Sequence, residues 1–132
     1  MRFFFYGTLM DVEIRGLVLG RRDGARPVEP ATLPGFRRVT MHRRSYPVIF
    51  PEPSTHVVGC LIRGLDRHAA ARLDAFETDE YDRIECAVVL VSSRSIDAWT
   101  YVAGRRATPS TMAWDLEAWR RRHKREYRRR LR

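Results

Sequence analysis

The feature that most constrains this chain is an apolar run near its start, Phe3-Phe4-Phe5-Tyr6, which a glycine interrupts at position 7. The run does not alternate between polar and apolar positions, so it is typical of a β-strand that is buried on both faces. A strand of this kind lies in the centre of a fold. We therefore expect residues 2–6 to form a central strand and the chain to leave the sheet at Gly7.

The residues that follow the run, Gly7, Thr8 and Leu9, are candidates for a ligand-binding turn. Glycine accepts positive φ angles and lets the backbone come close to a ligand. Three consecutive N–H groups that point the same way would form a nest for a carboxylate or an oxyanion. The alternative is a tight strand-to-helix turn that binds nothing, and both interpretations stay open on these residues alone.

The remaining chain alternates irregularly between helix and strand signals. Aspartates that can act as N-caps predict helices beginning after Asp11, Asp66 and Asp115, the first of which would carry Ile14, Leu17 and Val18 inward before Gly20 ends it. Between these helices we expect a polar loop over residues 21–30, a turn at Pro34-Gly35 and strands over residues 36–41, 46–50, 56–65, 84–91 and 96–102. Pro47 and Pro51 make the second of these strands an edge or irregular strand.

This order of elements fits neither a doubly wound sheet nor a β-sandwich. It predicts a compact α+β domain around a small, curled, mixed sheet. The 132 residues contain no internal repeat and no linker, so we expect one domain over residues 1–132.

Most of the positive charge lies at the C-terminal end. Residues 120–132 hold nine of the 25 Lys and Arg residues and one acid, so this segment carries +8 of the net +9. Apolar and aromatic residues recur there at helical spacing, which predicts an amphipathic helical tail with a solvated Arg face. Binding of nucleic acid or another polyanion through the tail stays open, although the motifs that read bases are absent.

Other sequence features favour a cytoplasmic protein that needs no metal or cofactor. No apolar run approaches the roughly 20 residues that a membrane helix requires. Cys60 and Cys86 lie in apolar, strand-like runs, and we expect both to be reduced and structural. No Cys or His spacing predicts a metal site.

Glu77 is the candidate acid. It lies at the C-terminal end of the helix expected after Asp66, where the helix dipole disfavours a negative charge, and flanking Phe76 and Tyr81 would add desolvation. Both effects raise the pKa of the carboxyl toward the range that suits general acid–base chemistry. The alternative is an exposed glutamate in an acidic patch. We expect Asp74 and Arg83 to have structural roles, and the pattern of a nucleophilic triad is absent.

Several short motifs appear in the order found in one known family. They are Tyr6-Gly7-Thr8-Leu9, Pro47-Val48-Ile49, Gly59-Cys60-Leu61, residues 73–77 with Tyr81-Asp82-Arg83, residues 98–102 and Trp114-Asp115. With these motifs the chain resembles the gamma-glutamylcyclotransferase-like superfamily, and specifically its AIG2-like and gamma-glutamylamine cyclotransferase branch. The resemblance covers about residues 2–123 and does not include the Arg-rich tail.

The resemblance implies a fold, an activity and a site. The fold is a small mixed β-barrel with flanking helices, and the activity releases 5-oxoproline and a free amine from a γ-glutamyl amide. It implies that Glu77 is the catalytic acid and base, that Tyr6, Gly7, Thr8 and Leu9 form the substrate loop, and that Tyr101 lines the pocket. Many relatives have Gly after this glutamate, where the chain has Thr78, so the turn there is in question. No cofactor is implied.

Two functional classes other than an enzyme stay open for this protein. One is a catalytically idle binding or regulatory domain with the same fold, and the other is a polyanion binder that acts through the tail. For the enzyme, the released amine and the oligomeric state also stay open. Because the motifs lie before the tail, we expect residues 124–132 to be dispensable for catalysis.

Overall fold

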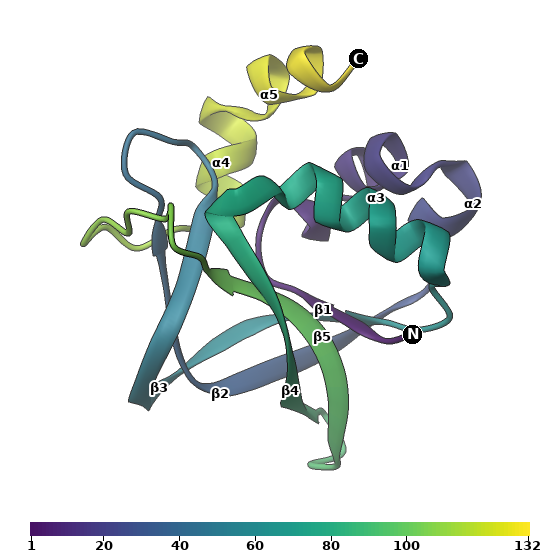
Figure 1. Ribbon diagram of the computed structural model, residues 1–132, viewed down its shortest axis with the longest axis vertical. Helices are drawn as coiled ribbons and strands as arrows, with labels where there is room; N and C mark the ends of the chain where they lie inside the picture. Colours follow the sequence, from purple (N-terminus) through teal and green to yellow (C-terminus); the bar gives the residue numbers. More distant parts are fainter.

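The strands of this protein close into a mixed five-stranded barrel, shown by a computed structural model that describes residues 1–132 (Figure 1). The strands are β1 (Phe3–Phe5), β2 (Val28–Thr40), β3 (Pro47–Ile62), β4 (Tyr81–Leu90) and β5 (Ser95–Ala103), and their order around the barrel is β1-β3-β2-β4-β5. β1 runs parallel to β5, and every other pair of neighbours is antiparallel. The expected α+β class and small mixed barrel are confirmed.

The helices gather at one side of the barrel, opposite the turn that joins β4 to β5 (Figure 1). They are α1 (Val12–Leu19), α2 (Arg21–Gly24), α3 (Arg67–Glu77), α4 (Leu116–Arg122) and α5 (Lys124–Leu131), with two short 3-10 helices, η1 (Thr8–Met10) and η2 (Thr78–Glu80). The three expected N-caps are confirmed, since Asp11, Asp66 and Asp115 each accept hydrogen bonds from backbone N–H groups in the first turn. None of the helices is both long and apolar enough to cross a membrane.

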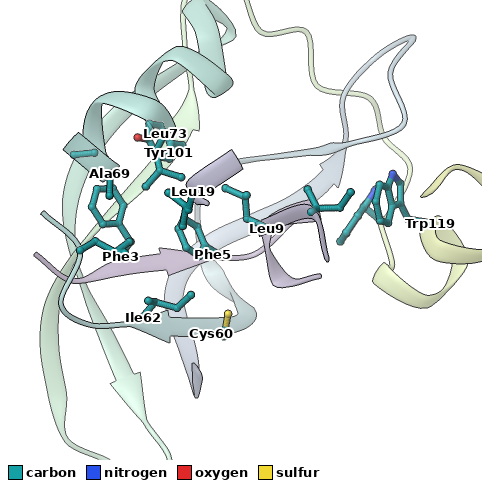
Figure 2. Close-up of a cluster of buried hydrophobic side chains, with 14 residues drawn as sticks. Phe3, Phe5, Leu9, Leu19, Cys60, Ile62, Ala69, Leu73, Tyr101 and Trp119 are labelled. Atoms are coloured by element: carbon teal, nitrogen blue, oxygen red, sulfur yellow. The ribbon is translucent and has the colours of Figure 1, made fainter. Parts of the chain in front are cut away.

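Strand β1 is buried on both faces, as its sequence predicts. Phe3 and Phe5 pack in a cluster of 14 buried residues between the barrel and the helices, together with Leu73 of α3 (Figure 2). Phe4 and Tyr6 point the other way and pack in a second cluster inside the barrel. Residues 3–6 therefore contribute side chains to both halves of the core. This packing fixes the position of the turn at Gly7, which follows directly after Tyr6.

The structure of strand β2 differs from two predictions made from the sequence. Residues 21–30, expected to be a loop, contain helix α2 and the start of β2. Pro34-Gly35 is not a turn but a bulge, where the pairing of β2 with β3 shifts between Pro34 and Phe36. Gly35 has a φ of 83°, which glycine adopts readily, and it stands opposite residues 52–55 of β3. The extra residues of the bulge therefore belong to β3, and β2 continues past it without ending.

Strand β3 likewise spans two segments that were predicted from the sequence to be separate strands. The strands expected over residues 46–50 and 56–65 are one strand that continues through Pro51 and Pro53. Residues Pro47–Pro51 pair only with β2, residues 52–55 pair with neither neighbour, and β1 pairs with residues Cys60–Ile62. One side of the proline-containing part is therefore free of ladder hydrogen bonds, as a proline-rich strand requires.

Two details near the chain ends also differ from expectation. Leu17 is 39% exposed, whereas Ile14 on the same helix is fully buried, so the inward face of α1 is narrower than predicted. The expected C-terminal helix is two helices that meet at His123, whose backbone leaves the helical region there. Cys60 and Cys86 are free thiols, as expected, while the cytoplasmic location stays a prediction.

Candidate functional site

The turn after β1 is shaped by a close contact with strand β3. Gly7 has a φ of −125°, so the glycine is not needed there for a positive φ angle. A Cβ atom at this position would instead lie 2.8 Å from Cγ of Pro47. The absence of a side chain lets the chain pass Pro47 and enter η1, and the Gly7 N–H makes no hydrogen bond within the backbone network. That N–H can donate to a ligand.

Glu77 is the last residue of α3 and turns toward the Gly7 loop. The chain leaves the helix at Thr78, which has a φ of 61° and a ψ of −163°. This region is nearly exclusive to glycine and costs other residues on the order of 1–3 kcal/mol. A threonine therefore holds this strained backbone conformation at the end of α3.

The carboxyl of Glu77 has a strongly raised pKa. Burial is the largest cause, followed by the nearby charges of Glu80 and Asp74, and together they raise the pKa of Glu77 from 4.5 to about 8. No hydrogen bond contributes to the shift. The direction expected from the sequence is confirmed, and the two neighbouring carboxylates act in the same direction as burial. Such a group can both accept and donate a proton near neutral pH.

The other two carboxyls near Glu77 are already paired. Asp74 accepts from Arg83 Nε at 3.0 Å and from the Tyr101 hydroxyl at 2.6 Å. Glu80 accepts from the Tyr46 hydroxyl and lies 3.5 Å from Arg44 Nε. Asp74 thus has the structural role predicted for it, and Glu77 is left as the carboxyl without a fixed partner.

Aromatic rings enclose Glu77, and sequence reasoning assigned most of them no role in the site. Tyr101, which was predicted, is held by its hydrogen bond to Asp74. Tyr81 donates to the Pro47 carbonyl at 2.6 Å, and burial raises its pKa far above the usual range. Tyr46 packs against Tyr81 with ring centroids 6.4 Å apart. These rings keep water from much of the site, which is the physical reason for the pKa shift of Glu77.

Tyr127 brings the C-terminal tail into the same site. Its ring contacts Phe76 and Trp119, with centroid separations of 6.5 and 5.3 Å. Its hydroxyl lies 3.3 Å from Oγ1 of Thr8 in the turn after β1. Tyr127 thus lines the pocket, which argues against the prediction that residues 124–132 are dispensable for catalysis. The helical spacing of the tail aromatics was the available signal, but it could not reveal what they pack against.

Ion pairs hold the tail against helix α1. Asp11, which is 1% exposed, accepts from both Arg120 and Lys124 at 2.9 Å. Glu13 accepts from Lys124 at 3.2 Å and from Arg128 at 2.6 Å. Burial would raise the pKa of Asp11, but the hydrogen bonds from Lys124 and Arg120 lower it below its usual range. One stripe of the basic tail is thus neutralised within the protein.

These elements surround a pocket of about 130 Å³. It is lined by every candidate site residue from the sequence, namely Tyr6, Gly7, Thr8, Leu9, Glu77 and Tyr101. Phe5, Tyr46, Pro47, Phe76, Thr78, Glu80, Tyr81 and Tyr127 complete the lining. The Tyr6 hydroxyl donates to the Tyr101 carbonyl at 2.7 Å, so this ring is a wall of the pocket and not a free donor. No cluster of three His, Cys, Asp or Glu side chains is placed to hold a metal ion.

Comparison with known proteins places this arrangement in a family. The family model described as "Gamma-glutamyl cyclotransferase, AIG2-like" matches residues 3–129. The chain belongs to this family. The match continues past the expected limit at residue 123 and includes Tyr127, so most of the tail is part of the family pattern.

Relatives of known sequence and structure agree with this assignment. AIG2-like protein A of Arabidopsis thaliana is 32% identical over 126 residues, which are 94% of this chain and 74% of that protein. AIG2-like protein D of the same plant is 34% identical and covers 91% and 79% of the two chains. A solution structure of an A. thaliana protein has a TM-score of 0.74 at 30% identity and covers 98% of this chain and 87% of that one. A structure titled gamma-glutamyl cyclotransferase has a TM-score of 0.66 at 20% identity over 83% of this chain and 71% of that one, which is a likeness of fold.

Proposed function

We propose that this protein is a γ-glutamyl cyclotransferase, which releases 5-oxoproline and a free amine from a γ-glutamyl amide. The observation that carries the proposal is the pairing of two features in one pocket. Glu77 is a carboxyl with a raised pKa and no fixed partner, and it shares the pocket with the backbone of Gly7, Thr8 and Leu9. Proton transfer and anion binding are the two tasks that this reaction requires.

The proposed reaction begins with proton removal. The Glu77 carboxylate takes a proton from the α-ammonium group of the substrate, and the resulting amine attacks the γ-carbonyl carbon of the same molecule. Because the attack is intramolecular, holding the substrate in a curled conformation supplies much of the rate acceleration. The aromatic walls of the pocket suit this task, since hydrogen bonds fix Tyr6, Tyr81 and Tyr101 in place.

The second half of the reaction returns the proton. The tetrahedral intermediate carries a negative oxygen, which the N–H groups of the Gly7 turn would stabilise, or these groups would anchor the α-carboxylate. Protonated Glu77 then gives its proton to the leaving nitrogen, and the C–N bond breaks. The ring nitrogen, which still carries two protons after the attack, loses one of them to Glu77, and this proton leaves with the released amine as an ammonium group while 5-oxoproline separates. A carboxyl with a pKa of about 8 is roughly one-tenth ionised at pH 7, so we expect kcat/KM to rise between pH 6 and 8.

The test is incubation with a panel of γ-glutamyl amides and detection of 5-oxoproline by mass. We expect Glu77→Gln to lower kcat at least about 10²-fold while substrate binding is kept, because Gln has the same shape but cannot carry the proton. Asp79→Asn is the matched control, since Asp79 follows closely in the chain but is 68% exposed and does not line the pocket. Binding without turnover by the wild-type protein would identify an idle binding domain instead.

A further inference from the structure

Asp74, Tyr101 and Arg83 form a hydrogen-bonded network behind one wall of the pocket. One carboxylate oxygen of Asp74 accepts from the Tyr101 hydroxyl at 2.6 Å and from Arg83 Nε at 3.0 Å, and the other accepts from a terminal guanidinium nitrogen at 3.3 Å. Tyr101 lines the pocket, whereas Asp74 and Arg83 do not. The two charged residues can therefore influence a bound substrate only through the residues that line the pocket.

Aromatic rings hold Arg83 in a fixed place. Its guanidinium lies 4.7 Å from the centroid of the Trp99 ring and 5.9 Å from that of the Phe3 ring, within the range of a cation–π contact. A planar guanidinium that stacks on a ring and donates two hydrogen bonds to one carboxylate has little freedom to turn. The carboxylate of Asp74 is therefore fixed as well, and it sets the direction of the Tyr101 hydroxyl.

The same network brings two charges close to Glu77. Asp74 lies three residues before Glu77 on α3, and side chains at this spacing on a helix are neighbours. After burial and Glu80, the charge of Asp74 is a further cause of the raised pKa of Glu77. For Tyr101, burial is the largest cause of a raised pKa, Asp74 adds to it, and Arg83 opposes it. Arg83 thus offsets part of the effect that Asp74 has on this pocket.

The other ionisable groups around Glu77 leave this balance of charges readable. Glu80 in η2 is the second carboxylate, and it lies 3.5 Å from Arg44 Nε. The remaining ionisable groups of the pocket lining are tyrosine hydroxyls, and burial is the largest cause of the raised pKa of each, so they stay neutral near neutral pH. They are Tyr6, Tyr46, Tyr81, Tyr101 and Tyr127. A change of charge at Asp74 or Arg83 should therefore appear as a shift in the titration of Glu77.

We propose that Asp74 and Arg83 are positioning residues that act on the site from outside the pocket. Asp74 anchors Tyr101 in the pocket wall and places a negative charge beside Glu77. Arg83 holds Asp74 in place and offsets this charge. The balance of the two charges sets the pH at which Glu77 changes from an acid to a base. This inference rests on the proposed cyclotransferase function and gives two residues that do not contact the substrate a role in it.

The first test is the pH dependence of kcat/KM for 5-oxoproline release in Asp74→Asn and Arg83→Gln. Asn removes the negative charge but keeps an acceptor for the Tyr101 hydroxyl, so the pH at which kcat/KM reaches half of its plateau should fall by about half a unit or more. Arg83→Gln leaves Asp74 without its counter-charge, so this pH should rise. A purely structural role would lower the rate without moving the profile in opposite directions.

The matched control is a second pair of the same kind, Glu29 and Arg63. Two guanidinium nitrogens of Arg63 donate to the two carboxylate oxygens of Glu29, and neither residue lines the pocket. Glu29→Gln and Arg63→Gln should keep the wild-type profile. Profiles of Asp74→Asn and Arg83→Gln that both stay in place, or that move in the same direction, would overturn the inference and leave the cyclotransferase function standing.

Asp74→Ala tests the anchoring of Tyr101. Ala offers no acceptor to the hydroxyl, so kcat/KM on the plateau of the pH profile should fall at least about tenfold, whereas Asp74→Asn should stay close to the wild type. Tyr101→Phe removes the other end of the same hydrogen bond, so Asp74→Ala should cost little more when Tyr101→Phe is already present. Fully additive losses would show that Asp74 does not act through Tyr101 and would overturn the anchoring.

A measurement on the free protein separates failure of this inference from failure of the proposed reaction. NMR of isotopically labelled glutamate carboxyls follows the titration of Glu77, whose signal is the one that Glu77→Gln removes. Its midpoint should fall in Asp74→Asn and rise in Arg83→Gln without any substrate. If the wild-type protein releases no 5-oxoproline from any γ-glutamyl amide, the proposed reaction is wrong. Opposite shifts of the midpoint would then still support the balance of charges, and unchanged midpoints would overturn it as well.

Discussion

The raised pKa of Glu77 makes a prediction about folding that does not depend on knowing the substrate. In the unfolded chain this carboxyl ionises near its ordinary pKa of 4.5, whereas in the folded protein it ionises near 8. Between these values the unfolded state loses a proton that the folded state keeps. The free energy of unfolding must therefore fall as the pH rises from about 4.5 to 8, and the loss is complete above 8.

The size of the effect follows from the shift. A difference of about 3.5 pKa units corresponds to on the order of 5 kcal/mol at 1.36 kcal/mol per unit. The side chain is only partly buried, because the pocket is open to solvent at its mouth, so part of this energy is screened. We expect roughly 2–4 kcal/mol between pH 5 and pH 9.

Glu77→Gln isolates this contribution, since Gln resembles the protonated acid and does not titrate. The free energy of unfolding of both proteins is measured by urea denaturation, with the fluorescence of buried Trp114 and Trp119 as the signal. The variant should be close to the wild type at pH 5 and more stable by the stated amount at pH 9. Titrations of groups distant from Glu77 are shared by the two proteins and cancel in the difference, and the difference includes the coupling of Glu77 to Glu80 and Asp74.

The outcome that would refute this reasoning is a stability difference that stays constant, within about 0.5 kcal/mol, from pH 5 to pH 9. Glu77 would then titrate alike in both states, and the argument for it as an acid and base near neutral pH would lose its basis. Asp79→Asn serves as the control, because Asp79 is 68% exposed and does not line the pocket.

Four further predictions follow from the geometry. Gly7→Val should weaken substrate binding at least tenfold in calorimetry because of the clash with strand β3, whereas Thr8→Ser should bind nearly as well as the wild type. Tyr127→Ala should lower kcat/KM per folded molecule at least tenfold, and wild-type activity in this variant would restore the view that the tail is dispensable. Asp11→Asn should lower the free energy of unfolding in urea by on the order of 2–3 kcal/mol, because two cations lose a buried partner, and a change below 0.5 kcal/mol would contradict this. Thr78→Gly should raise the free energy of unfolding by about 1 kcal/mol through relief of the positive φ angle, and a loss of stability would show that the strain is small.

The sequence alone predicted the features that depend on neighbouring residues. The apolar run 3–6 specifies a buried strand, because its side chains leave no polar face. Asp11, Asp66 and Asp115 specify helix starts, because a cap needs only the N–H groups two or three residues ahead. The position of Glu77 at a helix end, and the direction of its pKa shift, followed from the same local rules.

Only the tertiary structure decided the features that depend on residues far apart in the chain. Pro34-Gly35 has the local signature of a turn, but β2 pairs with β3 both before and after it, so it forms a bulge, because the ladder hydrogen bonds outweigh a single turn preference. The size of the Glu77 shift depends on burial beneath rings from several separate segments, and Tyr127 reaches the site across 119 residues from Thr8. The tail is the clearest case. Its composition specifies a charged helix, but its role is set by Asp11 and Glu13, two acids on another helix that only the closed fold brings within reach of Arg120, Lys124 and Arg128.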